Sequence, residues 1–207
     1  MDKKAIFDFD KTLISVNSFT YWVLFLWIIS LRKFNFRLFF KISYLIFLRK
    51  IIKKISHKDF KKELLLLNYE EKYDIIFCEK LHKYINHDVL NELIKLNNLN
   101  YSLAISSAAP EKYLKKYIKN YLKIDTILIV GSVVKNGLLL DNFKENKLSN
   151  LIKNNFLTND EEYDFLFTDS NDDILLAKNA KKIYLISPNK ETVQSYVNLY
   201  SSKIEIK

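Results

Sequence analysis

The feature that most constrains the fold is a series of short apolar runs, each closed by polar or acidic residues and followed by a helix-like stretch. The runs are residues 4–8, 102–106, 126–130, 163–167 and 182–186. Continuous apolar runs of this length are typical of a parallel sheet covered on both faces. The helix-like stretches are residues 111–121, 147–155, 174–181 and 190–200. Strands alternating with helices predict an α/β fold, a doubly wound Rossmann-like parallel sheet with right-handed crossovers.

One long segment interrupts this alternation. Residues 14–97 are predicted to be helical throughout, and no strand-like run occurs among them. We therefore expect a core of residues 1–13 and 98–207, with a helical cap of residues 14–97 inserted after the first strand. Within the core, Asn136-Gly137 lies between apolar residues and predicts a tight β-hairpin turn.

Composition excludes several classes of protein. The chain has 207 residues but only two glycines, Gly131 and Gly137, so neither a P-loop nor a dinucleotide-binding glycine fingerprint can be present. The single cysteine, Cys78, cannot form an internal disulfide or a zinc cluster. No cleavable signal precedes the first apolar run, and we expect a cytoplasmic protein.

Acidic and hydroxyl residues follow the predicted strands. Asp8 and Asp10 come after the first run, Ser106 closes the second, and Asp169 and Asp173 follow the run at 163–167. In an open α/β sheet the functional crevice lies at the carboxyl ends of the strands. Any one of these residues alone is expected at a loop or a helix N-cap. Together they would repel one another at a shared site, and Mg²⁺, which prefers oxygen ligands, relieves that repulsion.

These residues resemble the motifs of the haloacid dehalogenase superfamily of phosphatases. Residues 8–12, Asp-Phe-Asp-Lys-Thr, resemble its DxDxT first motif, and Ser106 resembles its second motif. Asp169 and Asp173 resemble the DxxxD form of the fourth motif. The order and spacing agree over the whole core. The cap position and the predicted hairpin most resemble the phosphoserine-phosphatase-like branch, the subfamily IB type.

The third motif of this superfamily is a lysine. Lys147 opens a predicted helix after the hairpin and matches it best, although Lys144 competes for the role.

The resemblance implies a Mg²⁺-dependent phosphomonoester hydrolase. Asp8 would be the nucleophile that forms an aspartyl-phosphate, and Asp10 the general acid and base. The implied phosphate-binding residues are Thr12, Ser106 and Lys147. The implied metal-binding residues are Asp8, Asp169 and Asp10, the last through its backbone carbonyl. Asp173 would be either a further ligand or a residue beside the ligands.

Two departures from the family pattern concern structure and substrate. Thr168 stands before Asp169, where the family usually has glycine. Asn17 stands nine residues after Asp8, where phosphoserine phosphatases place an acidic residue that meets the substrate ammonium. Asn17 and its neighbour Ser18 are our candidates for substrate specificity. The expected substrate is a small phosphorylated metabolite, namely an alcohol, amino alcohol, polyol or sugar phosphate.

The positive charge is concentrated in the predicted cap. Ten basic and no acidic residues lie between Asp10 and Asp59, and 11 aromatic residues lie between Phe19 and Phe47. We favour a buried cap, in which these aromatics pack against one another and the protein does not bind anionic liposomes. Peripheral contact of this basic, aromatic cap with an anionic membrane at the inner membrane face stays open. So much apolar surface is unlike a groove binder, and nucleic acid is not an expected partner.

Two alternative functions follow from the composition of the cap. One is a membrane-surface phosphatase of a lipid or polyprenyl phosphate. The other is a non-catalytic membrane-binding module on a haloacid dehalogenase fold. The second is disfavoured because Asp8, Asp10, Lys147 and Asp169 are all present.

Overall fold

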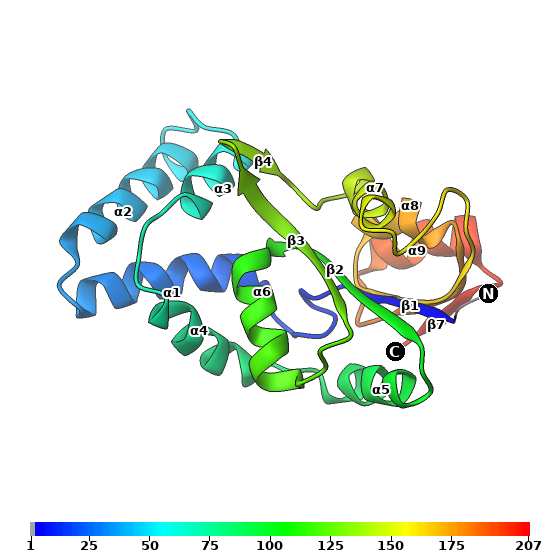
Figure 1. Ribbon diagram of the computed structural model, residues 1–207. Helices are drawn as coiled ribbons and strands as arrows, with labels where there is room; N and C mark the ends of the chain where they lie inside the picture. The colour runs from blue at the N-terminus through cyan, green and yellow to red at the C-terminus, as the bar shows by residue number, and fades with distance from the viewer. Residues whose placement is uncertain (1–2) are drawn as a thin grey trace.

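The computed structural model describes residues 3–207 and contains one seven-stranded sheet (Figure 1). The strand order is β4-β3-β2-β1-β5-β6-β7, and neighbouring strands are parallel except β3 and β4. The strands are β1 (Lys4–Phe7), β2 (Ser102–Pro110), β3 (Leu128–Lys135), β4 (Leu138–Leu140), β5 (Tyr163–Thr168), β6 (Ala180–Leu185) and β7 (Ile204–Ile206). The predicted α/β fold class is confirmed.

The sheet is buried on both faces, which explains the unbroken apolar runs. Ala5 and Phe7 of β1 belong to one hydrophobic core, and Ile6 between them belongs to the other. This division follows from the alternation of side chains along a strand. The first core contains the inner faces of the helices between β1 and β2, and the second contains helices from the C-terminal half of the chain.

Five helices lie between β1 and β2. They are α1 (Ser18–Arg32), α2 (Phe36–Lys50), α3 (His57–Leu65), α4 (Lys72–His82) and α5 (His87–Asn98). Asn17 caps α1, because its side-chain oxygen accepts a hydrogen bond from the Thr20 N–H at 2.8 Å. Trp22 and Phe25 on α1 are buried in the same core as Phe77 of α4. In Figure 1, α1 and α2 extend away from the sheet at the left.

The remaining helices connect the later strands. They are α6 (Glu111–Tyr117), which continues as a π-helical turn (Ile118–Leu122), α7 (Glu145–Lys153), a 3₁₀ turn (Asn171–Asp173), α8 (Ile174–Ala177) and α9 (Lys190–Tyr200). Several predicted boundaries are wrong: the strand expected at 102–106 continues to Pro110, and the strand expected at 126–130 is Leu128–Lys135. The helix expected at 174–181 ends at Ala177 because β6 already begins at Ala180, and β7 was not expected. None of the helices within residues 3–207 is both long and apolar enough to cross a bilayer.

The predicted hairpin turn joins β3 to β4. Asn136 and Gly137 have φ angles of 49° and 73°, the left-handed conformations that a two-residue type I′ turn requires. Its antiparallel strands are paired from Lys135 with Leu138 to Val133 with Leu140. The hairpin returns the chain toward the carboxyl ends of the parallel strands before α7 begins.

Strand order fixes where a ligand can bind. From the central β1 the chain builds β2 and β3 on one side, and β5, β6 and β7 lie on the other side. The carboxyl ends of β2, β1 and β5 therefore meet at the point where the direction of winding reverses, which is where open α/β sheets bind their ligands.

Candidate active site

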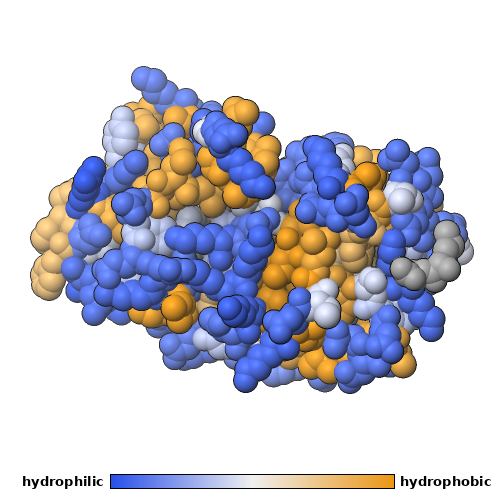
Figure 2. All heavy atoms as spheres, viewed as in Figure 1, coloured by the Kyte–Doolittle hydropathy of each residue, from blue (hydrophilic) through white to orange (hydrophobic). Residues whose placement is uncertain are grey.

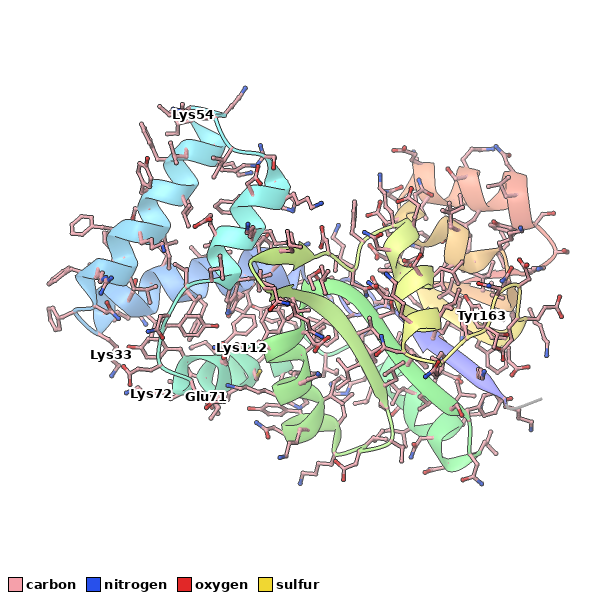
Figure 3. The ribbon with its side chains drawn as sticks, turned by 45° about the horizontal axis from the view of Figure 1, so that its top comes forward. Lys33, Lys54, Glu71, Lys72, Lys112 and Tyr163 are labelled. Atoms are coloured by element: carbon pink, nitrogen blue, oxygen red, sulfur yellow. The ribbon has the colours of Figure 1, made fainter. Side chains whose placement is uncertain are left out.

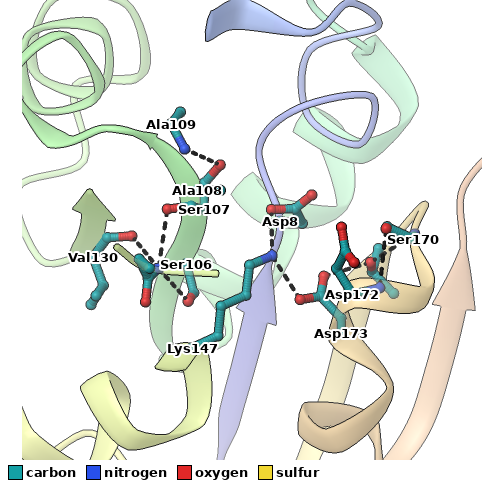
Figure 4. Close-up of polar contacts among 12 residues, drawn as sticks. Asp8, Ser106, Ser107, Ala108, Ala109, Val130, Lys147, Ser170, Asp172 and Asp173 are labelled. Carbon is teal, nitrogen blue, oxygen red and sulfur yellow. Dashed lines mark hydrogen bonds and ion pairs between the residues drawn. The ribbon is translucent and has the colours of Figure 1, made fainter. Parts of the chain in front are cut away.

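A buried lysine from α7 joins two carboxylates at this switch point (Figure 4). Lys147 Nζ lies 2.9 Å from Asp8 Oδ1 and 2.7 Å from Asp173 Oδ1, and all three side chains are at most 8% exposed. Lys144 is about half exposed and lies 3.9 Å from Asp172. Lys147, and not Lys144, is therefore the lysine beside Asp8.

Burial makes the charged forms of the carboxyl groups at this site costly. The pKa of Asp8 is raised to about 8: burial is the main cause, Asp173 and Asp169 contribute to the rise, and Lys147 opposes it. Burial also raises the pKa of Asp10, and it raises that of Asp169 to about 6. For Lys147, burial lowers the pKa, but the charges of Asp173 and Asp8 outweigh it and the pKa is raised. Perturbed groups gathered in one cavity are characteristic of functional sites.

Asp10 lies in the loop after β1, and the first residue of α1 fixes the position of its carboxylate. The Ser18 N–H donates a hydrogen bond to Asp10 Oδ1 at 3.0 Å. The Ser18 side chain is fully buried, and its hydroxyl lies 2.6 Å from the hydroxyl of Tyr113. Ser18, a candidate for substrate specificity in the sequence, does not line the cavity. Its N–H instead orients the Asp10 carboxylate.

Asp173 has both carboxylate oxygens engaged. Oδ1 pairs with Lys147, and Oδ2 accepts a hydrogen bond from the Thr168 hydroxyl at 2.7 Å. A glycine at position 168 could not supply that bond, so the departure from the family pattern has a structural use. Of the two roles predicted for Asp173, a metal ligand or a residue beside the ligands, these contacts favour the second. Asp173 holds Lys147 in place.

Ser106 and Ser107 lie within β2, where its pairing with β3 becomes irregular, and they differ in exposure to the site. Ser107 lines the central cavity, whereas Ser106 is buried and its hydroxyl oxygen accepts a hydrogen bond from Asn142 Nδ2 at 3.1 Å. The same Asn142 amide donates to the carbonyls of Ser107 and Val130, at 3.1 and 2.9 Å. Asn142 thus links β2 to β3 beside the cavity, and no motif marked it in the sequence.

Thr12 does not reach the cavity. It is fully buried, and its hydroxyl makes no hydrogen bond within residues 3–207. Its backbone N–H donates to the carbonyl of Phe9 at 3.4 Å, which braces the turn after β1. The Thr12 side chain therefore does not line the cavity, and the role that these contacts support is bracing of the turn.

The central cavity has a volume of about 280 Å³ and lies between the sheet edge and the inserted helices. The residues that line it from the sheet side include Asp8, Asp10, Ser107, Lys147 and Asp169. Those that line it from α1, α3 and the loop after β4 include Asn17, Phe19, Thr20, His57, Lys61, Asp141 and Phe143. Both sides of the cavity therefore carry charged groups, and the side formed by the inserted helices adds polar and aromatic side chains.

Lys61 of α3 is a second buried lysine, which sequence analysis missed. Its ammonium donates hydrogen bonds to the Ala108 carbonyl at 2.6 Å and to the Ser132 hydroxyl at 2.9 Å, and it pairs with Asp141. Burial lowers its pKa, and Asp141 opposes that shift. Lys61 and Lys62 are adjacent in the sequence, and only the packing of α3 shows which of them points inward.

The donor set fits Mg²⁺, the metal that the resemblance implies. Asp8 and Asp169 both line the cavity, and the pKa of each is raised, so a cation beside them would favour their ionised forms. Within residues 3–207 there is no group of three or more His, Cys, Asp or Glu side chains that could hold a metal. Two carboxylates, a backbone carbonyl such as that of Asp10 and water suit Mg²⁺, which keeps several waters when bound.

Fold and site together place the chain in a structural class. No model of a known protein family matches the sequence, and no curated protein matches it. Comparison of structures does find matches, and they show that the chain has the α/β fold of phosphoserine phosphatase and other haloacid dehalogenase hydrolases.

Three solved structures illustrate the likeness. A protein of unknown function from Bordetella pertussis Tohama I is 13% identical, with a TM-score of 0.71 over 99% of this chain and 98% of that one. A phosphoserine phosphohydrolase-like protein from Francisella tularensis subsp. tularensis SCHU S4 is 24% identical, with a TM-score of 0.58 over 98% and 94%. A phospho-aspartyl intermediate analogue of phosphoserine phosphatase is 16% identical, with a TM-score of 0.56 over 100% and 93%.

Proposed function

We propose that this protein is a Mg²⁺-dependent phosphatase that hydrolyses a small phosphorylated metabolite through Asp8. The observation that carries the proposal is the buried pairing of Asp8 with Lys147 at a cavity that Asp10 and Asp169 also line. The fold shared with phosphoserine phosphatase supports it. Assignment to subfamily IB rests on the sequence resemblance.

The chain's own residues provide a two-step reaction. A carboxylate oxygen of Asp8 attacks phosphorus, the bond from phosphorus to the ester oxygen breaks, and Asp10 gives its proton to the departing alkoxide. Asp10 then takes a proton from water, which attacks the aspartyl-phosphate and releases phosphate and the free Asp8 carboxylate. Lys147 offsets the charge on the phosphoryl oxygens. Bound Mg²⁺ would favour ionised Asp8 and stabilise the same charge.

The cavity supports a small polar substrate. Its volume of about 280 Å³ leaves little room beyond a phosphate and a short polar group. The wall that faces a leaving group contains Asn17, Thr20 and His57, which can hydrogen bond to hydroxyl or amino groups. Asn17 is neutral, so the acidic partner that phosphoserine phosphatases use for the substrate ammonium is absent at that position. Polyol and sugar phosphates, which carry no ammonium group, therefore fit better than phosphoserine.

A turnover screen tests the proposal. We expect phosphate release from at least one member of a panel of small phosphate esters in the presence of Mg²⁺, loss of release in EDTA and its return on adding Mg²⁺. Ca²⁺ should inhibit, since its larger and more flexible coordination shell misplaces the nucleophile. Asp169→Ala should raise the Mg²⁺ concentration needed for half-maximal rate. Full activity in chelator would contradict the metal site, and no turnover on any ester would favour the non-catalytic alternative.

A second test separates the role of Asp10 from that of Asp8. Asp10→Asn removes the proton donor, so turnover of alkyl phosphates should fall by roughly 10² to 10⁴. Turnover of p-nitrophenyl phosphate should fall much less, because its leaving group needs little protonation. The ratio of the two rates is the measurement. Equal losses on both substrates would remove Asp10 from this role.

A further inference from the structure

Helix α2 has two apolar faces, and only one of them is packed. Its inner face, Leu38, Ile42 and Leu45, is at most 5% exposed and packs in the helical layer that includes α1 and α3. The outer face, which we define as Phe36, Phe40, Tyr44, Phe47 and Ile51, is spaced four, four, three and four residues apart. That spacing aligns the five side chains along one side of a helix and of the residue that follows it.

The outer face is exposed along its whole length. The exposed fractions are 49% for Phe36, 65% for Phe40, 59% for Tyr44, 44% for Phe47 and 70% for Ile51. Phe34, in the turn between α1 and α2, is 77% exposed and packs edge-on against Phe36. Aromatic side chains this exposed are unusual on a surface that meets only water. Phe39 of α2 does stack on Trp27 and contacts Phe40, but the expectation of buried cap aromatics does not hold for the outer face.

Basic side chains surround the outer face. Exposed members include Arg32, Lys33, Arg37, Lys41, Lys53 and Lys54. None of them forms an ion pair within the described part of the chain, whereas many of the lysines elsewhere pair with a carboxylate. Figure 3 labels Lys33 and Lys54, which lie beyond opposite ends of α2, and Figure 2 shows hydrophobic and hydrophilic residues intermixed at this end of the molecule.

An exposed apolar face with basic side chains around it favours one kind of partner. A second copy of the same face would bring basic residues against basic residues and would be repelled. A nucleic acid would match the charge but not five large apolar side chains. The headgroup region of an anionic bilayer matches both, because apolar side chains enter the acyl boundary while lysine and arginine remain among the phosphates.

We propose that the outer face of α2, with Phe34 in the turn before it, binds the surface of an anionic membrane. The helix lies in the plane of the interface, with its 15 residues spanning about 22 Å. The inner face keeps its contacts with α1 and α3, so binding requires no unfolding of the cap. This inference does not depend on the proposed phosphatase activity, since none of the residues involved lines the central cavity.

Co-sedimentation of the full chain with vesicles tests the proposal. We expect binding to vesicles of phosphatidylcholine mixed with phosphatidylglycerol, little binding to phosphatidylcholine alone, and weaker binding as salt is added. Each basic residue at the surface strengthens binding roughly fivefold. Arg37→Glu with Lys41→Glu should therefore reduce binding well over tenfold. The matched control, Lys119→Glu with Lys190→Glu, makes the same charge change at exposed lysines away from α2 and should reduce binding much less.

An apolar variant separates a membrane from any other acidic partner. Phe40→Ser with Phe47→Ser keeps the charge, so it should weaken vesicle binding at least tenfold while leaving binding to soluble polyglutamate unchanged. Far-UV circular dichroism would establish that each variant keeps its helices. Absence of binding to acidic vesicles at low salt would overturn the proposal. So would equal losses in the α2 and control charge variants, or polyglutamate binding as tight as vesicle binding.

Discussion

Asp8→Asn is expected to abolish turnover while leaving the protein folded. The substitution keeps the shape of the side chain but removes the attacking oxygen charge, and loss of a nucleophile costs about four to six orders of magnitude in kcat. The measurement is kcat on the best substrate of the ester panel. A variant that kept a tenth of the wild-type rate would show that no aspartyl-phosphate forms at Asp8.

The same variant is expected to be more stable than the wild type at pH 8 without metal. Burial raises the Asp8 pKa from 3.8 to about 8, so between these values the folded protein holds a proton that the unfolded chain has lost. The free energy of unfolding therefore falls as pH rises through that interval, and asparagine removes this loss. We expect a Tm above wild type at pH 8 in EDTA and a smaller difference near pH 5. A Tm difference that does not change with pH would contradict the raised pKa.

Lys147→Met is the second substitution with a large expected effect, on stability as well as activity. Methionine keeps the length and packing of the side chain but leaves the carboxyls of Asp8 and Asp173 buried without a cation. Breaking a buried pair on one side costs about 3–5 kcal/mol. The free energy of unfolding in urea should fall by that order at neutral pH. Turnover should fall about 10²–10³-fold, as for loss of a donor to developing negative charge.

Lys144→Met is the matched control, since it makes the same change three residues earlier on an exposed side chain. Its free energy of unfolding should stay within about 0.5 kcal/mol of the wild type. Equal stability of the Lys147 and Lys144 variants would contradict the stabilising role of the ion pairs that Lys147 forms with Asp8 and Asp173.

The elements that sequence analysis predicted correctly are those whose signal is local. Apolar runs specified the parallel strands, and Asn136-Gly137 specified the hairpin turn, because strand burial and left-handed turns depend on neighbouring residues. The strand-end residues Asp8, Asp10 and Asp169 were found for a similar reason. Parallel strands bring their carboxyl ends together, so a residue that follows a strand is placed as soon as the strand order is known.

Roles that depend on tertiary partners were not predictable in this way. Thr12 and Ser18 occupy promising positions, but the turn after β1 buries both side chains away from the cavity. The role of Asp173, as a metal ligand or beside the ligands, was left open because nothing in the sequence shows that Lys147 and Thr168 would contact it. Lys61 and Asn142 carry no motif, and buried polar residues are recognised only by the partners that satisfy them.

The same argument applies to α2. Its apolar residues follow a helical period on two sides, and the pattern cannot say which side another element covers. Leu38 and Phe40 are both apolar and two positions apart, yet one is 4% exposed and the other 65%. Only the placement of α1 and α3 distinguishes them.

The contacts of Lys61 have a consequence for which molecules can enter. A buried ammonium with three acceptors joins α3, which forms one wall of the cavity, to the opposite wall at Ala108 of β2, Ser132 of β3 and Asp141 after β4. Moving α3 outward would separate the Lys61 ammonium from Asp141 and its other acceptors. Breaking a buried ion pair in this way costs about 3–5 kcal/mol of stability. We therefore expect ligands to enter and leave without the two walls separating. The cavity then acts as a rigid size filter, which rejects bulky esters at its mouth before chemistry can begin.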